Sequence, residues 1–479
     1  MKEKPILLLA ETGFIIRNLL LGYFAGSIAR KKKLIVAVKN PNDKNLQEII
    51  KGQNVELIYF PRDEKIPLGF VERAISWNNL IFGVQMAKKS NLSLKIQNKL
   101  FDNNNSIKKK LPEKIAVFFG KIINLVGLSN WVESAYLKKC IQQKPITKQW
   151  IDILKKHSPQ IVVSSMLTHC TRYQHSNDLP VIVAAQGLGI KTCSLIQSWD
   201  NLSSKTSLLP RFVDRYFTWS HSMSDELFQY NELITKGQVE VTGSPQYDFH
   251  LDESLIEPRE LYLAKFKQID PTKPYVLIGT GTSRWMPDEM DKVIQLSESI
   301  RKKIPKMQII IRLHPKDHGV RWEKYQYIFQ KPGIHLQKTC PEMKMDEGGF
   351  VPPKDFYRDQ INTIRHSACV INSSSSLSVD AAILDIPIIC IAYDLKKDTL
   401  FPEGRSLSYT KSVHYQKVVY TGGVWLVYSE KETVKAVESY YQFPYQHKEE
   451  RKQIVGLVTD QIEQKAGLRL SKEIEKLYH

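Results

Sequence analysis

Cysteine is scarce in this chain of 479 residues, which contains only six. No two of them form a Cys-x-x-Cys pair, which argues against zinc ribbons and thioredoxin-type redox sites. Four lie in or beside apolar runs typical of strands: Cys170, Cys193, Cys369 and Cys390. We therefore expect buried free thiols in a reducing compartment rather than a disulfide framework.

Long hydrophobic runs are also missing from the start of the chain. The first apolar run ends at Glu11, and the next one is interrupted by Arg17. Neither reaches the roughly 20 apolar residues that a membrane-spanning helix needs. We therefore expect a cytoplasmic protein with neither a membrane span nor a secretion signal.

Low-complexity segments and short repeats are absent, and the composition is 42% hydrophobic and 25% charged. These globular proportions exclude a disordered, collagenous or coiled-coil chain. No Gly-x-x-x-x-Gly-Lys-Ser/Thr sequence occurs, which excludes P-loop chemistry.

Positive charge is abundant, and it is concentrated in the first third of the chain. The formal net charge is +18, and residues 1–150 contain 26 Lys and Arg against 11 Asp and Glu. Residues 67–139 mix aromatic side chains with lysine clusters, which fits either a helical insertion with solvated lysines or an amphipathic element on an anionic membrane surface. No nucleic-acid-binding motif accompanies the charge, so we expect an anionic inner membrane surface as partner rather than nucleic acid.

Strand-like and helical segments alternate in the same rhythm in both halves. Because continuous β-branched runs separated by helices indicate parallel strands covered on both faces, we predict two doubly wound, Rossmann-like α/β domains facing across a cleft. The expected domains are residues 1–245 and 274–445, joined by a linker at 246–273 and followed by helices at 446–479 that cross back to the first domain. Strands are expected at 5–10, 34–39, 55–60, 161–165, 181–185, 193–198, 216–220, 239–242, 275–280, 307–312, 334–336, 368–372, 387–391 and 424–428, with one helix over 14–33.

Two loops of the second half carry small and hydroxyl residues directly after a predicted strand. The first contains Gly279, Thr280, Gly281, Thr282 and Arg284; the second contains Ser373, Ser374, Ser375 and Ser376 and opens a helix. Backbone amides in such loops bind phosphate, helped by the helix dipole and by a nearby cation. The alternative for the second loop is that one serine only caps the helix.

A third signal, Arg312-Leu313-His314-Pro315, follows another strand of the same half. Pro315 ends the strand and leaves His314 at the carboxyl end of a parallel sheet, where ligands of such folds bind. A structural histidine is the alternative. Together, the three loops predict a phosphate or pyrophosphate site for a nucleotide-activated donor.

These motifs resemble the donor domain of GT-B-fold glycosyltransferases. The likeness is greatest to the group with an Arg-x-His-Pro turn and a serine-rich phosphate loop, which includes CDP-glycerol glycerophosphotransferases and bacterial sialyl- and Kdo-type transferases. Further matches are Gly243-Ser244-Pro245, Ala392-Tyr393-Asp394-Leu395 and Thr421-Gly422-Gly423. The resemblance implies that Arg312, Gly422 and Gly423 also serve the donor site.

The catalytic base is predicted in the first half. Where the CDP-glycerol family resembles Gln-Thr-Trp-His-Gly, this chain has Gln197-Ser198-Trp199-Asp200-Asn201. The aspartate brings the site nearer to sialyltransferase-like enzymes, in which a carboxylate removes the proton of the acceptor hydroxyl. Asp200 is therefore the predicted base, Glu11 is its rival, and a turn-capping role is the alternative for Asp200.

Absent motifs refine this prediction. No Asp-x-Asp occurs, so the metal motif of GT-A transferases is missing. The paired glutamates of many retaining GT-B enzymes are also missing. The Gly-Thr-Arg-Pro-Glu opening of UDP-N-acetylglucosamine 2-epimerases is absent as well. We predict an inverting glycosyltransferase without metal or cofactor, moving sugar from a nucleotide-sugar donor to a saccharide or lipid-linked acceptor in surface polysaccharide or lipooligosaccharide synthesis. The alternatives are a CDP-polyol phosphotransferase and a non-catalytic lipid- or polyanion-binding scaffold.

Overall fold

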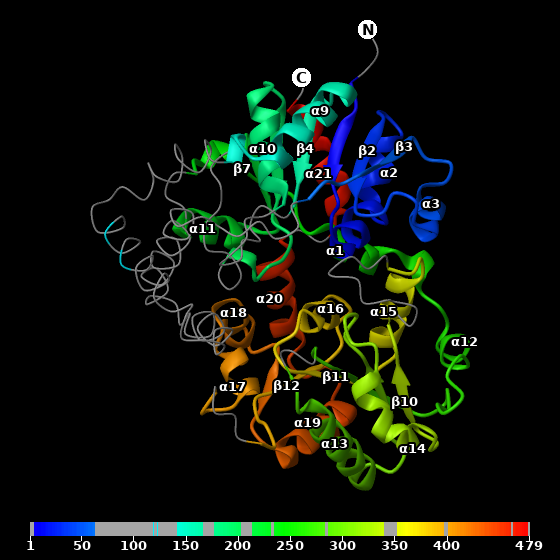
Figure 1. Cartoon of the computed structure of the whole chain (residues 1–479). Helices are drawn as coiled ribbons and strands as arrows, with labels where there is room; N and C mark the ends of the chain where they lie inside the picture. The colour runs from blue at the N-terminus through cyan, green and yellow to red at the C-terminus, as the bar shows by residue number, and fades with distance from the viewer. Residues whose placement is uncertain are drawn as a thin grey trace. The chain divides into compact units, whose positions relative to one another are not determined.

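Figure 1 shows the structure of the chain, a computed structural model. The structure describes residues 4–62, 118, 122, 141–165, 177–202, 213–230, 234–282, 286–339, 352–396, 401–460 and 463–477. The predicted insertion at 67–139 lies outside these residues except for Phe118 and Ile122, so its membrane role stays a prediction.

The chain forms two compact units, each an α/β domain built on one parallel sheet. Unit 1 consists mainly of Met1–Gln246 with Thr459–His479, and unit 2 mainly of Tyr247–Met345 with Pro352–Val458. The sheets have seven and six strands. The predicted class of fold, two doubly wound α/β domains, is therefore confirmed.

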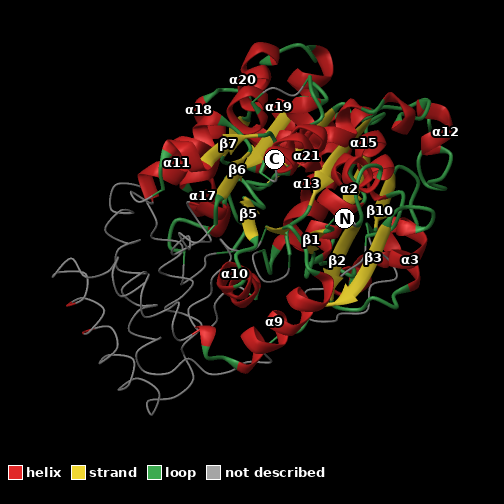
Figure 2. Ribbon diagram, turned by 90° about the horizontal axis from the view of Figure 1, so that it is seen from above, coloured by secondary structure: helices red, strands yellow, loops and turns green. Residues whose placement is uncertain are grey.

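Unit 1 has the strand order β3-β2-β1-β4-β5-β6-β7, with every neighbouring pair parallel. The order reverses between β1 and β4, which makes that point of the carboxyl edge the topological switch point. Figure 2 shows β1, β2 and β3 side by side. The strands are β1 Ile6–Leu9, β2 Leu34–Val38, β3 Val55–Tyr59, β4 Ile161–Ser164, β5 Lys191–Leu195, β6 Arg215–Thr218 and β7 Val239–Val241.

The helices of unit 1 contain two corrections to the sequence prediction. The expected strand at 181–185 is wrong, because it lies inside helix α10 (Asp178–Gly187), whose side chains from Leu179 to Ala185 are almost all buried. A helix that is apolar on all sides has no hydrophobic periodicity that would distinguish its sequence from that of a buried strand. The expected single helix at 14–33 is also wrong: α1 (Gly13–Ile15) and the π-helix η1 (Ile16–Leu20) are separated from α2 (Tyr23–Ala29) by extended Gly22.

The last helix of the chain, α21 (Ala466–Lys476), packs against α2 within unit 1. Ser27 Oγ lies 2.8 Å from Ser471 Oγ, and Lys31 forms an ion pair with Glu475 at 2.9 Å. Arg469 donates to the carbonyl of Thr242 at 2.9 Å. The remaining helices of unit 1 are α3 (Lys44–Ile50), α9 (Pro145–His157), α11 (His221–Tyr230) and the 3-10 helix η5 (Lys236–Gln238).

Unit 2 has the strand order β10-β9-β8-β11-β12-β13, again all parallel. Its switch point lies between β8 and β11. The strands are β8 Tyr275–Gly279, β9 Gln308–Arg312, β10 Ile334–Gln337, β11 Cys369–Asn372, β12 Ile388–Ile391 and β13 Trp425–Val427. The core between sheet and helices includes Ile309, Ile311, Trp322 and Tyr440.

Helices cover both faces of this second sheet. They are α12 (Arg259–Leu263), α13 (Glu289–Lys303), α14 (Gln326–Phe329), α15 (Phe356–Arg365), α16 (Leu377–Ile383), α17 (Arg405–Thr410), α18 (Val413–Tyr420), α19 (Glu430–Gln442) and α20 (Lys448–Thr459), with 3-10 turns η6 (Pro245–Leu251), η7 (Glu253–Leu255) and η8 (Val320–Tyr325). Among the described helices, none has the length and apolarity that crossing a bilayer requires.

Candidate functional site

The carboxyl edge of the unit 2 sheet brings the three predicted loops together. The loop with Thr280 and Thr282 follows β8, the serine loop follows β11, and these two strands are neighbours on either side of the switch point. His314 follows β9, which pairs with the other side of β8. Ligands of doubly wound sheets bind at such switch points, so the site predicted from the sequence is spatially coherent.

Gly279 lies where the two loops meet. A Cβ added to this residue would collide with Cδ2 of Leu377, the first residue of α16. The end of β8 and the serine loop are therefore in van der Waals contact. This packing explains Gly279 without a ligand, and its predicted contact with phosphate stays a prediction.

His314 is oriented by two hydrogen bonds. Its backbone amide donates to Thr280 Oγ1 at 3.2 Å, and its Nδ1 accepts from the amide of Lys316 at 3.0 Å. Because Nδ1 acts as an acceptor, the neutral imidazole carries its proton on Nε2. His314 is thus able to donate a hydrogen bond from Nε2 to an oxygen.

Arg321, in η8, ties the loops after β8 and β9 together. Its guanidinium donates to the carbonyls of Gly281 and Met286, both at 2.7 Å, and to the carboxylates of Asp317 at 2.7 Å and Glu289 at 3.1 Å. The sequence analysis missed this residue, because no motif marks an arginine whose partners lie on three separate segments. The planar fork satisfies four acceptors at once, so it ties the loop after β8 to the loop that contains His314.

Glu289 belongs to the same network and is buried. Burial raises the pKa of its carboxyl group, while the amide of Gly281 and the charge of Arg321 oppose that rise. The Gly281 amide donates to both Glu289 oxygens at 2.9 Å. The predicted binding of phosphate by the Gly281 amide would therefore require this hydrogen bond to open.

The serine loop uses only part of its polar groups internally. The amide of Ser375 donates to Asn372 Oδ1 at 3.1 Å, Ser375 Oγ caps the amide of Leu377 at 3.2 Å, and the amide of Ser374 points to Cys390 Sγ at 3.4 Å. Ser376 is exposed, and within the described residues its amide has no partner. Ser375 therefore accepts from one amide of the first turn, whereas Ser376, the N-cap residue of α16, forms no side-chain cap hydrogen bond, and its amide is among the groups left for an anion.

Thr282 supplies a second unsatisfied group at this edge. Its Oγ1 is buried, and no described residue forms a hydrogen bond with it. The amide of Met286 donates to its carbonyl at 2.8 Å, which closes the loop after β8. Arg284, the predicted cation of this loop, lies outside the described residues.

Three predicted donor-site residues have structural explanations. Arg312 is buried, and its charge lowers the pKa of Tyr262 and Asp359, although burial raises both pKa values overall. Gly422 adopts a positive φ of 78°, and a Cβ on Gly423 would lie 2.7 Å from the carbonyl oxygen of Glu450 in α20. A donor role of these residues stays a prediction.

Two further polar contacts of unit 2, each made by a buried side chain, were missed by the sequence analysis. Lys292 contacts Asp394 at 3.1 Å and Ser406 Oγ at 3.0 Å, which fixes the loop after β12. His250 Nε2 lies 3.0 Å from Oδ1 of Asp380, on α16. Both pairs hold segments next to the carboxyl edge.

In unit 1, Glu11 follows β1 and lies at the switch point of the seven-stranded sheet. It is 8% exposed, and Asn177, before α10, donates to its Oε1 at 2.7 Å. Arg62, which follows β3, lies 4.0 Å away. The rival base is therefore held by residues from two neighbouring loops.

Asp200 lies in the turn after β5. Ser198 Oγ donates to Asp200 Oδ1 at 2.6 Å, and the amide of Ser198 donates to Asn201 Oδ1 at 2.7 Å. These bonds form the local turn considered as the alternative for Asp200. The Asp200 side chain is partly exposed. Its role as catalytic base therefore stays a prediction, in addition to its role in this hydrogen-bonded turn.

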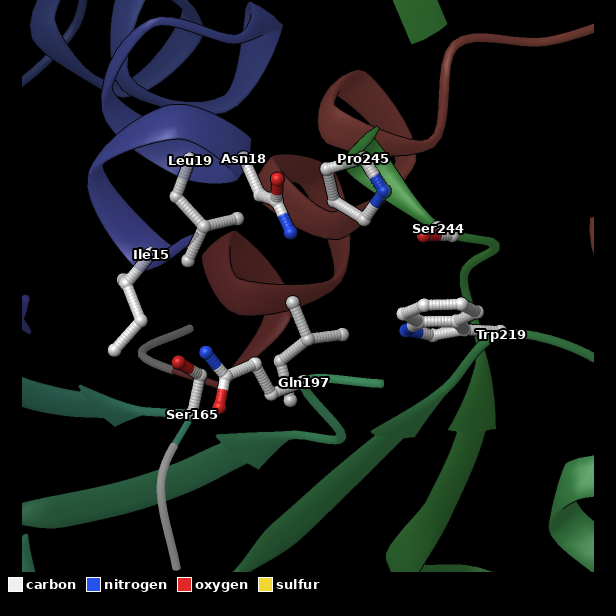
Figure 3. A pocket seen from close by; sticks show the side chains of 9 residues that line it. Ile15, Asn18, Leu19, Ser165, Gln197, Trp219, Ser244 and Pro245 are labelled. Atoms are coloured by element: carbon white, nitrogen blue, oxygen red, sulfur yellow. The ribbon is translucent and has the colours of Figure 1, made fainter. Parts of the chain in front are cut away.

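A small pocket opens at the carboxyl edge of the unit 1 sheet (Figure 3). It is lined from α1 and η1 and from the segments that follow β4, β5, β6 and β7. Ser165 and Gln197 lie beside each other on one side, and Trp219 and Ser244 on the other.

Neither unit shows a metal centre in its described part, where no group of three or more His, Cys, Asp or Glu is arranged to hold an ion. Of the predicted buried thiols, Cys193, Cys369 and Cys390 are free and buried. Cys170 lies outside the described residues.

No family model matches the sequence, and no curated protein matches it significantly. Solved structures do match over nearly the whole chain. UDP-GlcNAc 2-epimerase from Neisseria meningitidis, bound to UDP-GlcNAc, has a TM-score of 0.53 at 13% identity, covering 99% of both chains. The enzyme of the same name from Methanocaldococcus jannaschii, in complex with UDP-GlcNAc and UDP, has a TM-score of 0.52 at 13% identity, covering 99% of this chain and 100% of that one.

A structure described as a glycosyltransferase from Rickettsia africae also matches. Its TM-score is 0.53 at 10% identity, and the alignment covers 100% of this chain and 99% of that one. At such identities the likeness establishes the fold alone. The chain therefore has the GT-B-like architecture that its motifs resemble, whereas the narrower CDP-glycerol, sialyl- or Kdo-transferase group is not distinguished.

Proposed function

We propose that this protein is a glycosyltransferase that takes a sugar from a nucleotide-activated donor and transfers it to the hydroxyl of a saccharide or lipid-linked acceptor. The observation that carries the proposal is the switch point of unit 2. There the serine loop with its unpartnered Ser376 amide, the buried Thr282 hydroxyl and the Nε2 of His314 belong to loops at the ends of adjacent strands.

These groups suit a departing nucleoside diphosphate or monophosphate. Backbone amides and hydroxyls of loops attract negative charge, and His314 donates from Nε2 to a phosphate oxygen. Donors fixed before the reaction stabilise charge as it develops on the leaving group. Arg321 positions these donors by bracing the loops after β8 and β9.

The acceptor hydroxyl needs a base, and two carboxylates of unit 1 are available. Asp200 is our first assignment because it is partly exposed, and Glu11 is the rival because it lies at the switch point of its sheet. Asp200→Asn and Glu11→Gln keep size and hydrogen bonding but remove basicity. The base is the residue whose amide variant lowers kcat at least about 100-fold with unchanged nucleotide binding.

The decisive experiment measures thermal stabilisation and binding heats with UDP, dTDP, GDP, CDP and CMP, with and without EDTA. Ser376→Pro removes the unpartnered amide, whereas Ser376→Ala keeps it and serves as the matched control. We expect one nucleotide to bind the native protein and the alanine variant equally, and the proline variant at least tenfold more weakly. Binding that survives in the proline variant, or no response to any nucleotide, contradicts the proposed site.

An epimerase is the second candidate, because UDP-GlcNAc 2-epimerases are among the structural neighbours. Against it stands the sequence after β1, Glu11-Thr12-Gly13, in place of the opening typical of those enzymes. Incubation of UDP-GlcNAc in D2O without acceptor separates the two. Epimerisation exchanges the hydrogen at the epimerised carbon for deuterium, whereas a transferase leaves that carbon protonated.

The same panel tests the other functions that the motifs allow. Selective binding of CDP together with phosphodiester bonds in the product would identify a polyol phosphotransferase. Full biological activity of His314→Ala and Asp200→Ala would identify a scaffold. The membrane partner is tested separately by sedimentation with anionic liposomes at low salt.

A further inference from the structure

The turn between α19 and α20 is both exposed and apolar. Phe443 is 63% exposed, Tyr445 is 76% exposed, and Pro444 between them is exposed as well. Single apolar side chains are common on protein surfaces, but a run of three exposed ones is unfavourable in water unless it serves a contact. The turn therefore marks a candidate interaction surface of unit 2.

Positive charge lies beside this turn, at the end of α13. Residues 301–306 contain four cations and no acidic side chain: Arg301, Lys302, Lys303 and Lys306. Helix α13 packs against α19 (Figure 1), and Lys306 Nζ lies 4.8 Å from the centroid of the Tyr441 ring, at the end of α19. On the other side of the turn, Lys448 Nζ lies 5.6 Å from the centroid of the Tyr445 ring. The apolar turn and these cations therefore form one surface.

The surface continues towards β10 along the amino edge of the sheet. Arg301 donates to the carbonyl of Pro332 at 3.0 Å, and Lys331 Nζ lies 5.8 Å from the ring centroid of Tyr327, which is 61% exposed. These segments end helices or lead into β9 and β10, so the topology gathers them at the amino ends of the strands. We call this surface the lysine–aromatic band; it consists of residues 301–306, Tyr327, Lys331, Tyr441, Phe443, Pro444, Tyr445 and Lys448.

The lysine–aromatic band has more positive charge than its own ion pairs neutralise. Lys303 pairs with Glu438 at 3.3 Å, and Lys448 pairs with Asp385 at 3.2 Å. Other lysines of the band are exposed and have no ion-pair partner within the described part of the chain: Lys302, Lys306 and Lys331. We therefore expect an anionic partner for the band.

The aromatic rings decide which kind of anionic partner fits. A soluble polyanion would bind the lysines but leave Phe443 in water. At the surface of an anionic bilayer, by contrast, aromatic rings lie at the level of the headgroups and an apolar ring reaches the acyl chains. The lysine stems cover apolar surface there, while the ammonium groups contact lipid phosphates.

We propose that the lysine–aromatic band docks unit 2 on a membrane surface that contains anionic lipid. The inference goes beyond the proposed function, because the band lies at the amino edge of the sheet, opposite the carboxyl edge that carries the predicted donor site. It also assigns membrane contact to residues other than the insertion at 67–139. Docking through the amino edge leaves the carboxyl edge of this sheet open to nucleotide from solution.

The test measures sedimentation of the full chain with lipid vesicles. The vesicles consist of phosphatidylcholine alone or of phosphatidylcholine mixed with phosphatidylglycerol, at low and at high salt. The apolar variants are Phe443→Ser and Tyr445→Ser. Their matched control is Tyr59→Ser, because Tyr59 is 57% exposed on β3 of unit 1, outside the band.

A second pair of variants tests the charge. Lys302→Glu/Lys306→Glu reverses two exposed cations of the band. Lys51→Glu/Lys236→Glu is the matched control, because it makes the same change in net charge at two exposed lysines of unit 1. All these variants change exposed side chains, so we expect each to keep the melting temperature and the nucleotide binding of the native protein.

The native protein should bind the mixed vesicles at low salt and be released at high salt, since salt screens the attraction of lysines to anionic lipid. Phe443→Ser and Lys302→Glu/Lys306→Glu should each lower the vesicle partition coefficient at least about tenfold, and Tyr445→Ser in the same direction. Both controls should stay within about twofold of the native value.

Two results would overturn the proposal directly. One is a native protein that ignores the mixed vesicles, and the other is vesicle binding that the band variants leave unchanged, which would assign membrane contact to other residues. If the protein ignores vesicles and the band variants abolish polyphosphate binding or self-association in sedimentation velocity, the band serves a polyanion or a second copy, and the proposal is wrong.

Failure here is distinguishable from failure of the proposed function. Nucleotide binding is measured without vesicles, and vesicle binding is measured without nucleotide. A protein that binds its nucleotide but no vesicle keeps the proposed function and loses this inference.

Discussion

Replacement of Arg321 by methionine is the sharpest test of the network that braces the loops after β8 and β9. The variant loses four hydrogen bonds and leaves the carboxylates of Glu289 and Asp317 without their guanidinium. Removing one partner of a buried ion pair costs about 3–5 kcal/mol. Asp317 still accepts from Trp322 Nε1 at 3.1 Å and from the amide of Gly319 at 3.0 Å, which favours the lower end, about 3 kcal/mol.

The pH dependence of this cost has a defined sign. Burial raises the folded-state pKa of Glu289 above its ordinary value of 4.5, so the folded state binds more protons than the unfolded state in the window just above 4.5. Stability therefore falls as the pH rises through that window. Arg321 lowers this pKa, so its removal extends the loss to higher pH, and Arg321→Met is expected to be less destabilising at pH 5 than at pH 8.

The assay is scanning calorimetry of the native protein, Arg321→Met and the double variant Arg321→Met/Glu289→Gln at both pH values. A loss of about 3 kcal/mol corresponds to a decrease in melting temperature of about 6–12 °C for a unit of this size. A neutral amide in place of the Glu289 carboxylate no longer needs a counterion, so the double variant should recover about 1–2 kcal/mol at pH 8. Equal melting temperatures of the single and double variants at pH 8, or a larger loss at pH 5, would refute the reasoning.

Three further predictions follow from packing and burial. Gly423→Ala should destabilise the protein by about 1–3 kcal/mol because the added Cβ collides with the backbone of α20. Gly456 is exposed within α20 and has no atom near the position of a Cβ, so Gly456→Ala should stabilise the protein by about 0.5–1 kcal/mol. Thermal unfolding measures both changes. Burial lowers the pKa of His335 to about 4, so the folded state resists its protonation and stability is lost as the pH falls from 6.5 towards 4; His335→Phe should flatten that part of the melting profile. Burial raises the thiol pKa values, so mass-spectrometric mapping after iodoacetamide treatment at pH 8 should find these cysteines unmodified until the protein unfolds: Cys193, Cys369 and Cys390.

The sequence predicted the architecture well where local patterns reflect local environments. Runs bounded by turns marked every strand of the unit 1 sheet, with β5 displaced by a few residues. The signal was clearest for β1 and β2, which are buried on both faces and therefore continuously hydrophobic. The run at 181–185 misled for the same reason, since α10 is buried on all sides. The break at Gly22 escaped notice because an extended glycine inside an apolar helix pattern has no periodic signature.

The candidate site was predictable only in part. Motifs after strands placed Thr280, His314 and the serine loop at one edge, since the carboxyl ends of parallel strands share an edge. The partners of each amide were not predictable. Gly281 is engaged by Glu289, eight residues further on, and Arg321 acts on segments that precede it by up to 40 residues. Such partners depend on tertiary packing, which one sequence without relatives does not reveal.

The position of α21 has a consequence for the order in which the protein is made. Unit 1 is discontinuous along the chain, because the helix that packs on α2 is synthesised only after residues 247–458, which belong mainly to unit 2. Until then, the surface of α2 that receives Ser471 and Glu475 is left uncovered on a nascent chain whose first sheet already has all its strands. Helix α21 therefore completes unit 1 only after unit 2 has been synthesised, and a ribosome-bound chain that lacks this helix exposes this surface of α2 to chaperones.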